Sequence, residues 1–201
     1  MTARSQETPV QDTQAQSIFR TSLEASWNVG RRLAYSRTSV AGLFPMDTDR
    51  LDSITDAEEE KLDALLFRFS SAFSMVQDHL FKSIAIVEGE DISTSSRRDV
   101  ANLMEKLGAI PSSSDITALS ALRNKVSHVY PDHPEKQAEI LNGIHQNAEV
   151  LLGVMRDLSA YVVRKGLLAE PPRFEVSLDG VNVADPFQGP DDPGASPLEK
   201  E

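Results

Sequence analysis

The sequence contains no cysteine. This absence excludes a disulfide framework, a cysteine nucleophile and any zinc or iron–sulfur site built on thiolates, and it fits a reducing compartment. No stretch approaches the roughly 18 apolar residues of a membrane span, and the segment 1–16 lacks the apolar core of a signal peptide. We therefore expect a cytoplasmic protein with no membrane partner.

Aromatic residues are few, at 6%, although 40% of the 201 residues are hydrophobic. Such a chain can bury a core of mainly aliphatic side chains, and its length suits one domain plus a tail. The net charge of −11 argues at first against a nucleic-acid ligand. However, more than half of that charge lies in residues 169–201, where eight acidic residues face two basic ones. The rest of the chain could still present a local basic site.

Apolar residues recur at steps of three and four along most of the chain, which predicts helices. One begins at Thr55, because Thr55 and Glu58 form a capping box. Gly108 and Gly166 mark helix ends, Pro134 suits a first turn, and Gly30 interrupts the first pattern. The predicted helices span about 11–40, 55–88, 97–107, 116–129 and 134–166. The predicted fold is an all-α bundle of about five helices.

Composition divides the chain into three parts. We expect residues 1–10 to be disordered, residues 11–166 to form the helical domain, and residues 167–201 to form a flexible tail rich in proline, glycine and acid. In the tail, the alternation from Phe174 to Val183 around Asp179-Gly180 matches a short β-hairpin. Two strands alone are marginal in water, so this segment either forms transient β structure or docks on the body or on a partner.

Familiar catalytic motifs are missing. The chain has no phosphate-binding P-loop, no dinucleotide fingerprint, no nucleophile elbow and no His-Glu-x-x-His pair. No two histidines have the i, i+4 spacing of a helical metal site, so we predict neither a metal nor a cofactor. Structural positions are expected for His79, His133 and His145.

His128 differs because of its neighbours in the segment 121–131, ALRNKVSHVYP. Arg123 and Tyr130 are seven residues apart and share a helix face, whereas His128 lies about 140° from Arg123 on an ideal helix. The helix must loosen for the three to converge, and Pro131 ends it at that point. The negative end of the helix dipole favours a protonated imidazole there.

This segment resembles the signature of the HEPN superfamily, an Arg, a polar residue, three further residues and a His. With Tyr130 it is similar to HepT-like toxins of type VII toxin–antitoxin pairs, and the similarity extends over about residues 55–165, including Arg97-Arg98-Asp99-Val100. The resemblance implies a metal-independent endoribonuclease that works as a homodimer. His128 would be the general base or acid at the ribose 2′-OH, Arg123 would stabilise the phosphorane, and Asn124 would position the imidazole or the phosphate.

The resemblance also assigns Tyr130 as the residue to which a nucleotidyltransferase antitoxin attaches AMP, which would block the anion site. The candidates for holding RNA phosphates are Lys125, Arg31, Arg32, Arg97 and Arg98. DNA is not expected as a partner. Two alternatives stay open: a non-catalytic HEPN subunit that presents a nucleotide or tyrosine to a nucleotidyltransferase, and a plain interaction bundle.

Overall fold

The computed structural model of the chain describes residues 13–126 and 133–174. Within these ranges it contains helices and no strand, which confirms the all-α prediction. The segment 1–10 and, of the expected tail 167–201, residues 175–201 lie outside the described residues, and with them almost the whole predicted hairpin. The elements are α1 (Gln14–Ser39), η1 (Ala41–Leu43), α2 (Thr48–Asp52), α3 (Asp56–Ser74), η2 (Met75–Leu80), α4 (Phe81–Val87), α5 (Arg97–Lys106), α6 (Ser113–Val126) and α7 (Pro134–Lys165).

Helix boundaries follow local hydrogen bonding. The predicted capping box before α3 is present: the Thr55 N–H donates to Glu58 Oε2 at 2.8 Å, and the Glu58 N–H donates to Thr55 Oγ1 at 3.3 Å. Pro134 opens α7, and Gly166 closes it in the left-handed conformation, with φ of 62°. The short helix α2 was not predicted, since its five residues offer a single apolar side chain, Leu51.

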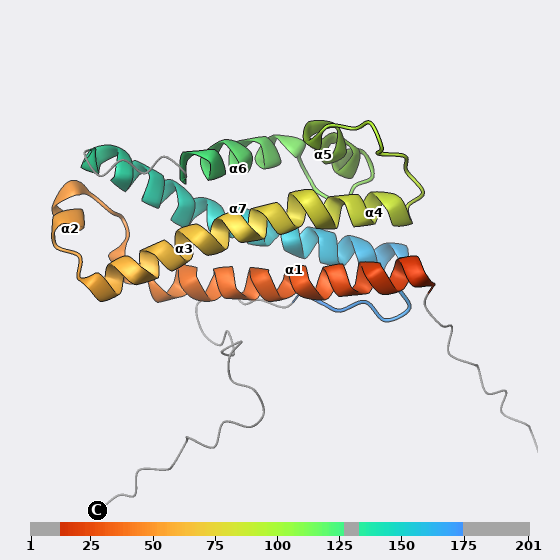
Figure 1. Cartoon of the computed structure of the whole chain (residues 1–201), viewed down its shortest axis with the longest axis horizontal. Helices are drawn as coiled ribbons and strands as arrows, with labels where there is room; N and C mark the ends of the chain where they lie inside the picture. Colours follow the sequence, from red (N-terminus) through yellow and green to blue (C-terminus); the bar gives the residue numbers. More distant parts are fainter. Residues whose placement is uncertain (1–12, 127–132, 175–201) are drawn as a thin grey trace, which may run out of the picture.

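Three long rods form the core of the bundle (Figure 1). α1 packs along α3 and α7, and the rod made by α3, η2 and α4 lies between α1 and the pair α5 and α6. α5 and α6 pack on the side of this central rod that faces away from α1, and α6 also contacts α7. The pair α5 and α6 thus forms one outer face of the bundle.

The central rod contains a π-helical segment, η2, where the sequence predicted one uninterrupted α-helix. Buried residues recur there as adjacent pairs every four residues: Ala72 and Phe73, Val76 and Gln77, Leu80 and Phe81, Ile84 and Ala85. On an α-helix a four-residue repeat drifts by about 40° at each step. A π-helical turn contains more residues than an α-helical turn, which cancels this rotation. The pairs therefore stay on the buried side of the rod.

Residues 167–174 lie against the bundle. The Trp27 indole N–H donates to the Pro172 carbonyl at 2.8 Å, and the Phe174 N–H donates to Ser159 Oγ at 3.1 Å. The Phe174 side chain is buried against Trp27, with ring centroids 5.2 Å apart. It also covers Gly30, where a Cβ would come within 2.8 Å of the Phe174 ring. α1 therefore continues through Gly30, and the close packing explains why glycine stands there.

We expect Gly30→Ala to destabilise the protein by about 1–3 kcal/mol because the added methyl group overpacks the contact with Phe174 and Met155. In a Phe174→Ala background the same change should cost clearly less, because the contact that remains, 2.7 Å to Met155 Cε, is with the end of a flexible side chain. Urea unfolding of the four proteins measures both values.

Gly153→Ala on α7 is the matched control, because the nearest side-chain atom to a Cβ there is 3.8 Å away. It should stabilise the protein in either background. Equal effects of Gly30→Ala with and without Phe174 would contradict the packing described here.

Candidate functional site

The last described turn of α6 contains three of the predicted site residues, Arg123, Asn124 and Lys125. The catalytic candidate His128 and the modification candidate Tyr130 lie outside the described residues. Arg123 is half-buried, and its Nη1 donates to Asn124 Oδ1 at 3.5 Å. The salt bridges among the described residues do not include Arg123.

Arg123 and Asn124 line a small depression of about 30 Å³ between α6, η2 and the start of α5. It adjoins a larger one of about 330 Å³ along α5 and α6. Four residues line both: Gln77, Arg97, Ser120 and Asn124. We call the combined surface the α5–α6 cleft; its other lining residues are Phe73, Ser74, Asp78, Arg98, Ala101, Ile116, Thr117, Ala121 and Arg123.

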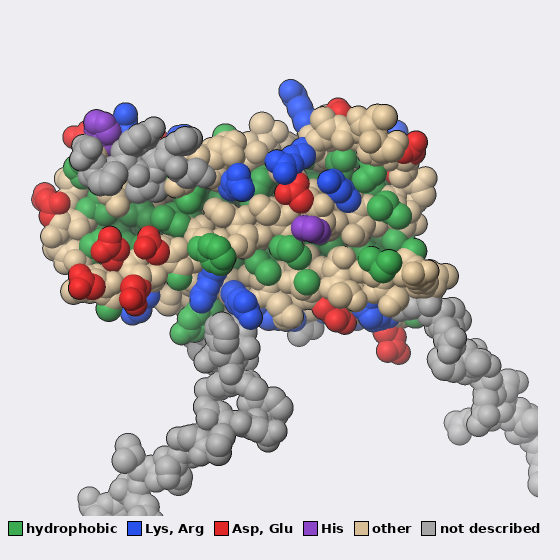
Figure 2. Space-filling view, in the orientation of Figure 1, with side chains coloured by type: hydrophobic (Ala, Val, Ile, Leu, Met, Phe, Trp, Pro, Cys, Tyr) green, Lys and Arg blue, Asp and Glu red, His purple; other side chains and the backbone are tan. Residues whose placement is uncertain are grey.

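The cleft brings together basic side chains from separate parts of the sequence. Arg97 and Arg98 occupy the first turn of α5, where the helix dipole adds positive potential, and Arg123 joins them from α6. Figure 2 shows Lys and Arg side chains gathered over this part of the surface, around one acidic group. The arrangement suits an anionic ligand more than the net charge of −11 suggests.

An ion pair fixes α5 to the central rod. Arg97 Nε lies 2.8 Å from Asp78 Oδ1, and Arg97 Nη2 donates to Asp78 Oδ2 at 3.2 Å, which gives the two-pronged geometry typical of arginine and carboxylate. The N-terminus of α5 is held by Ser96, whose N–H and hydroxyl both donate to the Asp99 carboxylate. These hydrogen bonds lower the pKa of Asp99. Asp78 thus partly neutralises Arg97 and holds the start of α5 against η2.

The other predicted phosphate ligands lie elsewhere. Lys125 Nζ lies 3.6 Å from Glu139 Oε1 on α7, away from the cleft. Arg31 and Arg32 belong to α1, and Arg31 donates to Asn28 and to the Arg173 carbonyl. Of the five cations that the sequence suggested, Arg97 and Arg98 alone line the cleft with Asn124.

Gln77 and Asp78 were missed by sequence reasoning because they lie far from the motif in the chain. A signal was nonetheless present: Gln77 interrupts an apolar stripe at a position where the four-residue spacing requires burial. A polar residue at such a position usually has a hydrogen-bonding role.

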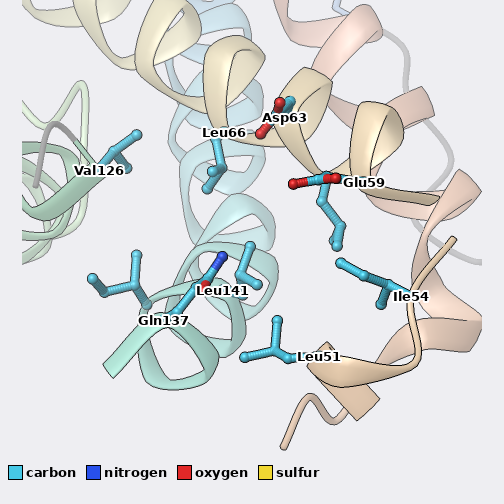
Figure 3. A pocket seen from close by; sticks show the side chains of 10 residues that line it. Leu51, Ile54, Glu59, Asp63, Leu66, Val126, Gln137 and Leu141 are labelled. Carbon is cyan, nitrogen blue, oxygen red and sulfur yellow. The ribbon is translucent and has the colours of Figure 1, made fainter. Parts of the chain in front are cut away.

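A second pocket, of about 250 Å³, lies between α2, α3 and α7, on the other side of the α6 end (Figure 3). Its floor is apolar and includes Leu51, Leu66 and Leu141, while Glu59 and Asp63 stand at its rim on α3. The acidic rim disfavours a phosphate ligand here, so the α5–α6 cleft is the better candidate for nucleic-acid chemistry.

The described histidines outside the motif differ in their surroundings. His79 is exposed on η2. His145 stacks on Phe44 with ring centroids 4.0 Å apart, and its Nε2 is buried without a hydrogen-bond partner among the described residues. Burial, followed by the nearby Arg37 charge, lowers the pKa of His145 from its ordinary value of 6.5.

Comparison with protein-family models, with curated proteins and with solved structures finds no match for this chain. Within the described ranges, none of the helices has both the length and the apolar character needed to cross a membrane. In the same ranges, no group of three or more histidine, aspartate and glutamate side chains is arranged to hold a metal ion.

Because the pKa of His145 is lowered on folding, the unfolded chain binds more protons than the folded one just below pH 6.5. The free energy of unfolding therefore has its full value, as far as His145 is concerned, above pH 6.5. It decreases as the pH falls from 6.5 toward the lower pKa of the folded state. His145→Phe keeps the stack on Phe44 and removes the titration. We expect its unfolding free energy, relative to wild type, to rise between pH 7.5 and 5.5 by about 1 kcal/mol or less, measured by urea denaturation.

His79→Gln is the control, because this histidine is exposed. It should leave the pH dependence of wild type in place. A His145→Phe protein with the same pH dependence as wild type would show that the stacked imidazole does not titrate differently on folding.

Proposed function

We propose that the protein is a metal-independent endoribonuclease toxin that cleaves RNA by attack of a ribose 2′-OH on the adjacent phosphate. The observation that carries this proposal is that Arg123 and Asn124, which precede His128 by five and four residues in the sequence, line one cleft with Arg97. The resemblance of Arg123, Asn124, His128 and Tyr130 to the HEPN signature supports the same assignment.

The chemistry requires one bond to form and one to break. The 2′-oxygen bonds to phosphorus, the bond from phosphorus to the 5′-oxygen breaks, and a 2′,3′-cyclic phosphate and a 5′-hydroxyl remain. A proton leaves the 2′-OH and another reaches the departing 5′-oxygen, which is work for His128 as general base and acid. Arg123 stabilises the charge that grows on the phosphorane, a bidentate task for which lysine is a poor substitute.

One chain supplies a single copy of this motif. We propose that a symmetric homodimer places two copies face to face, so that one His128 accepts a proton while the other donates one. Asn124 orients the phosphate or the imidazole. In this scheme Lys125, which pairs with Glu139 on α7, has a peripheral role in holding RNA.

Regulation is proposed to act on the same site. A nucleotidyltransferase antitoxin would attach AMP to Tyr130, two residues beyond His128. The added phosphodiester is an anion and would occupy the positive potential that Arg123 provides for RNA. Toxin and antitoxin would then act together in the cytoplasm.

The test is RNA cleavage by the purified protein, together with growth and RNA integrity after induction in a bacterial host. We expect wild type to leave 2′,3′-cyclic phosphate ends, His128→Ala to abolish cleavage, and Arg123→Ala to reduce kcat by about 10²–10³-fold. Arg123→Lys should restore only a small part of the rate, because lysine lacks the planar fork.

Lys106→Ala removes an exposed charge at the far end of α5 and should cleave RNA like wild type. Absence of cleavage by wild type would overturn the ribonuclease proposal. If Tyr130 were then found to receive AMP from a nucleotidyltransferase, the non-catalytic HEPN partner would take its place.

A further inference from the structure

Gln77 is a buried polar residue without an evident structural task. Its side chain is 8% exposed, it lies on η2 between Val76 and Asp78, and it lines both depressions of the α5–α6 cleft. The Gln77 amide has no hydrogen-bond partner within the described ranges. It is not among the side-chain atoms that are both buried and unpaired there, so it reaches the open space of the cleft. An amide that opens on a cleft without a protein partner can both donate a hydrogen bond to a ligand there and accept one from it.

The residues around this amide form a pocket of mixed chemistry. Arg97 and Arg98 stand at the positive end of the α5 dipole, while Thr117, Ser120 and Asn124 offer polar groups from α6. Ala101 and Ile116 supply a small apolar surface. Guanidinium groups suit a phosphate, an amide suits the edge of a base because it both donates and accepts, and an apolar wall suits the face of a base.

The size and position of the pocket restrict the range of possible ligands further. At about 330 Å³ it lies at the lower end of the range of small-molecule sites, which suits one nucleotide better than a longer segment. It is continuous with the depression that Arg123 lines. A nucleotide held here would thus adjoin the phosphate at Arg123.

We propose that the α5–α6 cleft binds one nucleotide of single-stranded RNA next to the cleavage point, with Arg98 on its phosphate and the Gln77 amide on its base edge. This inference rests on the proposed ribonuclease function and adds a recognition subsite to it. Arg97 contributes less to phosphate binding, because its guanidinium is already paired with Asp78.

Substitutions of Gln77 and Arg98 should change RNA binding in different ways. Gln77→Leu keeps the volume and removes the hydrogen bonds, so discrimination among bases should fall to within about twofold while the salt dependence of binding stays unchanged. Arg98→Gln should weaken binding of all sequences similarly, by about 3–10-fold, and reduce the slope of log affinity against log salt by about 0.7.

Asp78→Asn should increase the affinity for RNA, a result that a misfolded protein would not give. Removing the carboxylate releases Arg97 for the ligand and removes a negative charge from the cleft. We expect tighter RNA binding, by about threefold or more at low salt, and a steeper salt dependence. The loss of one exposed ion pair should change stability by at most about 1 kcal/mol.

The experiment measures fluorescence anisotropy of labelled tetranucleotides of A, C, G or U, carrying 2′-O-methyl groups so that they cannot be cleaved. Nucleoside 5′-monophosphates compete in a parallel arm, which separates RNA from free nucleotide as the source of the ligand. The matched controls are Gln146→Leu on the exposed face of α7 and Lys106→Gln on α5, both outside the cleft. Both controls should bind like wild type.

The subsite is supported if wild type prefers one base, Gln77→Leu loses the preference, and Asp78→Asn binds more tightly. Equal base preference in wild type and Gln77→Leu, or unchanged binding by Arg98→Gln, would overturn it even if RNA cleavage is observed. Tight binding of monophosphates without binding of tetranucleotides would overturn the assignment to RNA. Conversely, base-selective binding by a protein that does not cleave RNA would keep the subsite and reject the proposed nuclease.

Discussion

Buried side chains on the central rod recur in adjacent pairs every four residues, and the position of the cleft depends on this spacing. A regular α-helix would rotate the later pairs away from the core, so the backbone adopts the π segment η2 instead. The same adjustment keeps Gln77 on the buried side of the rod, where it lines the cleft shared by α5 and α6. One packing constraint thus positions both the buried side chains of the central rod and the polar side chain of Gln77.

The electrostatics of the cleft follow from how α5 is attached. Ser96 and Asp99 cap its N-terminus, and Arg97 pairs with Asp78 on η2. Arg98 and Arg123 are therefore the cations best placed for an anion, with the α5 dipole adding to their potential. A chain of net charge −11 can in this way maintain a local site for a polyanion, because screening limits the reach of distant acidic residues to about 8–10 Å.

The all-α fold could be predicted because its helices follow regular apolar spacing and begin or end at recognisable caps, as at Thr55 and Gly166. α2 escaped prediction because one turn has no periodicity to detect. The alternation around Phe174 predicts a β-strand, whereas its burial against Trp27 depends on a contact between α1 and the segment that follows α7, far apart in the sequence. For the site, the motif pointed to Arg123 and Asn124, but their neighbour Gln77 required the three-dimensional packing.

The central claim is that RNA binds in the α5–α6 cleft, and NMR titration of the full chain with an uncleavable single-stranded oligonucleotide tests it most directly. If RNA binds there, the side-chain amide signals of Gln77 and Asn124 shift together and saturate at the same RNA concentration, while those of Gln146 stay in place. Shifts confined to the acidic pocket between α2, α3 and α7, or no shift of the Gln77 amide at saturation, would contradict it.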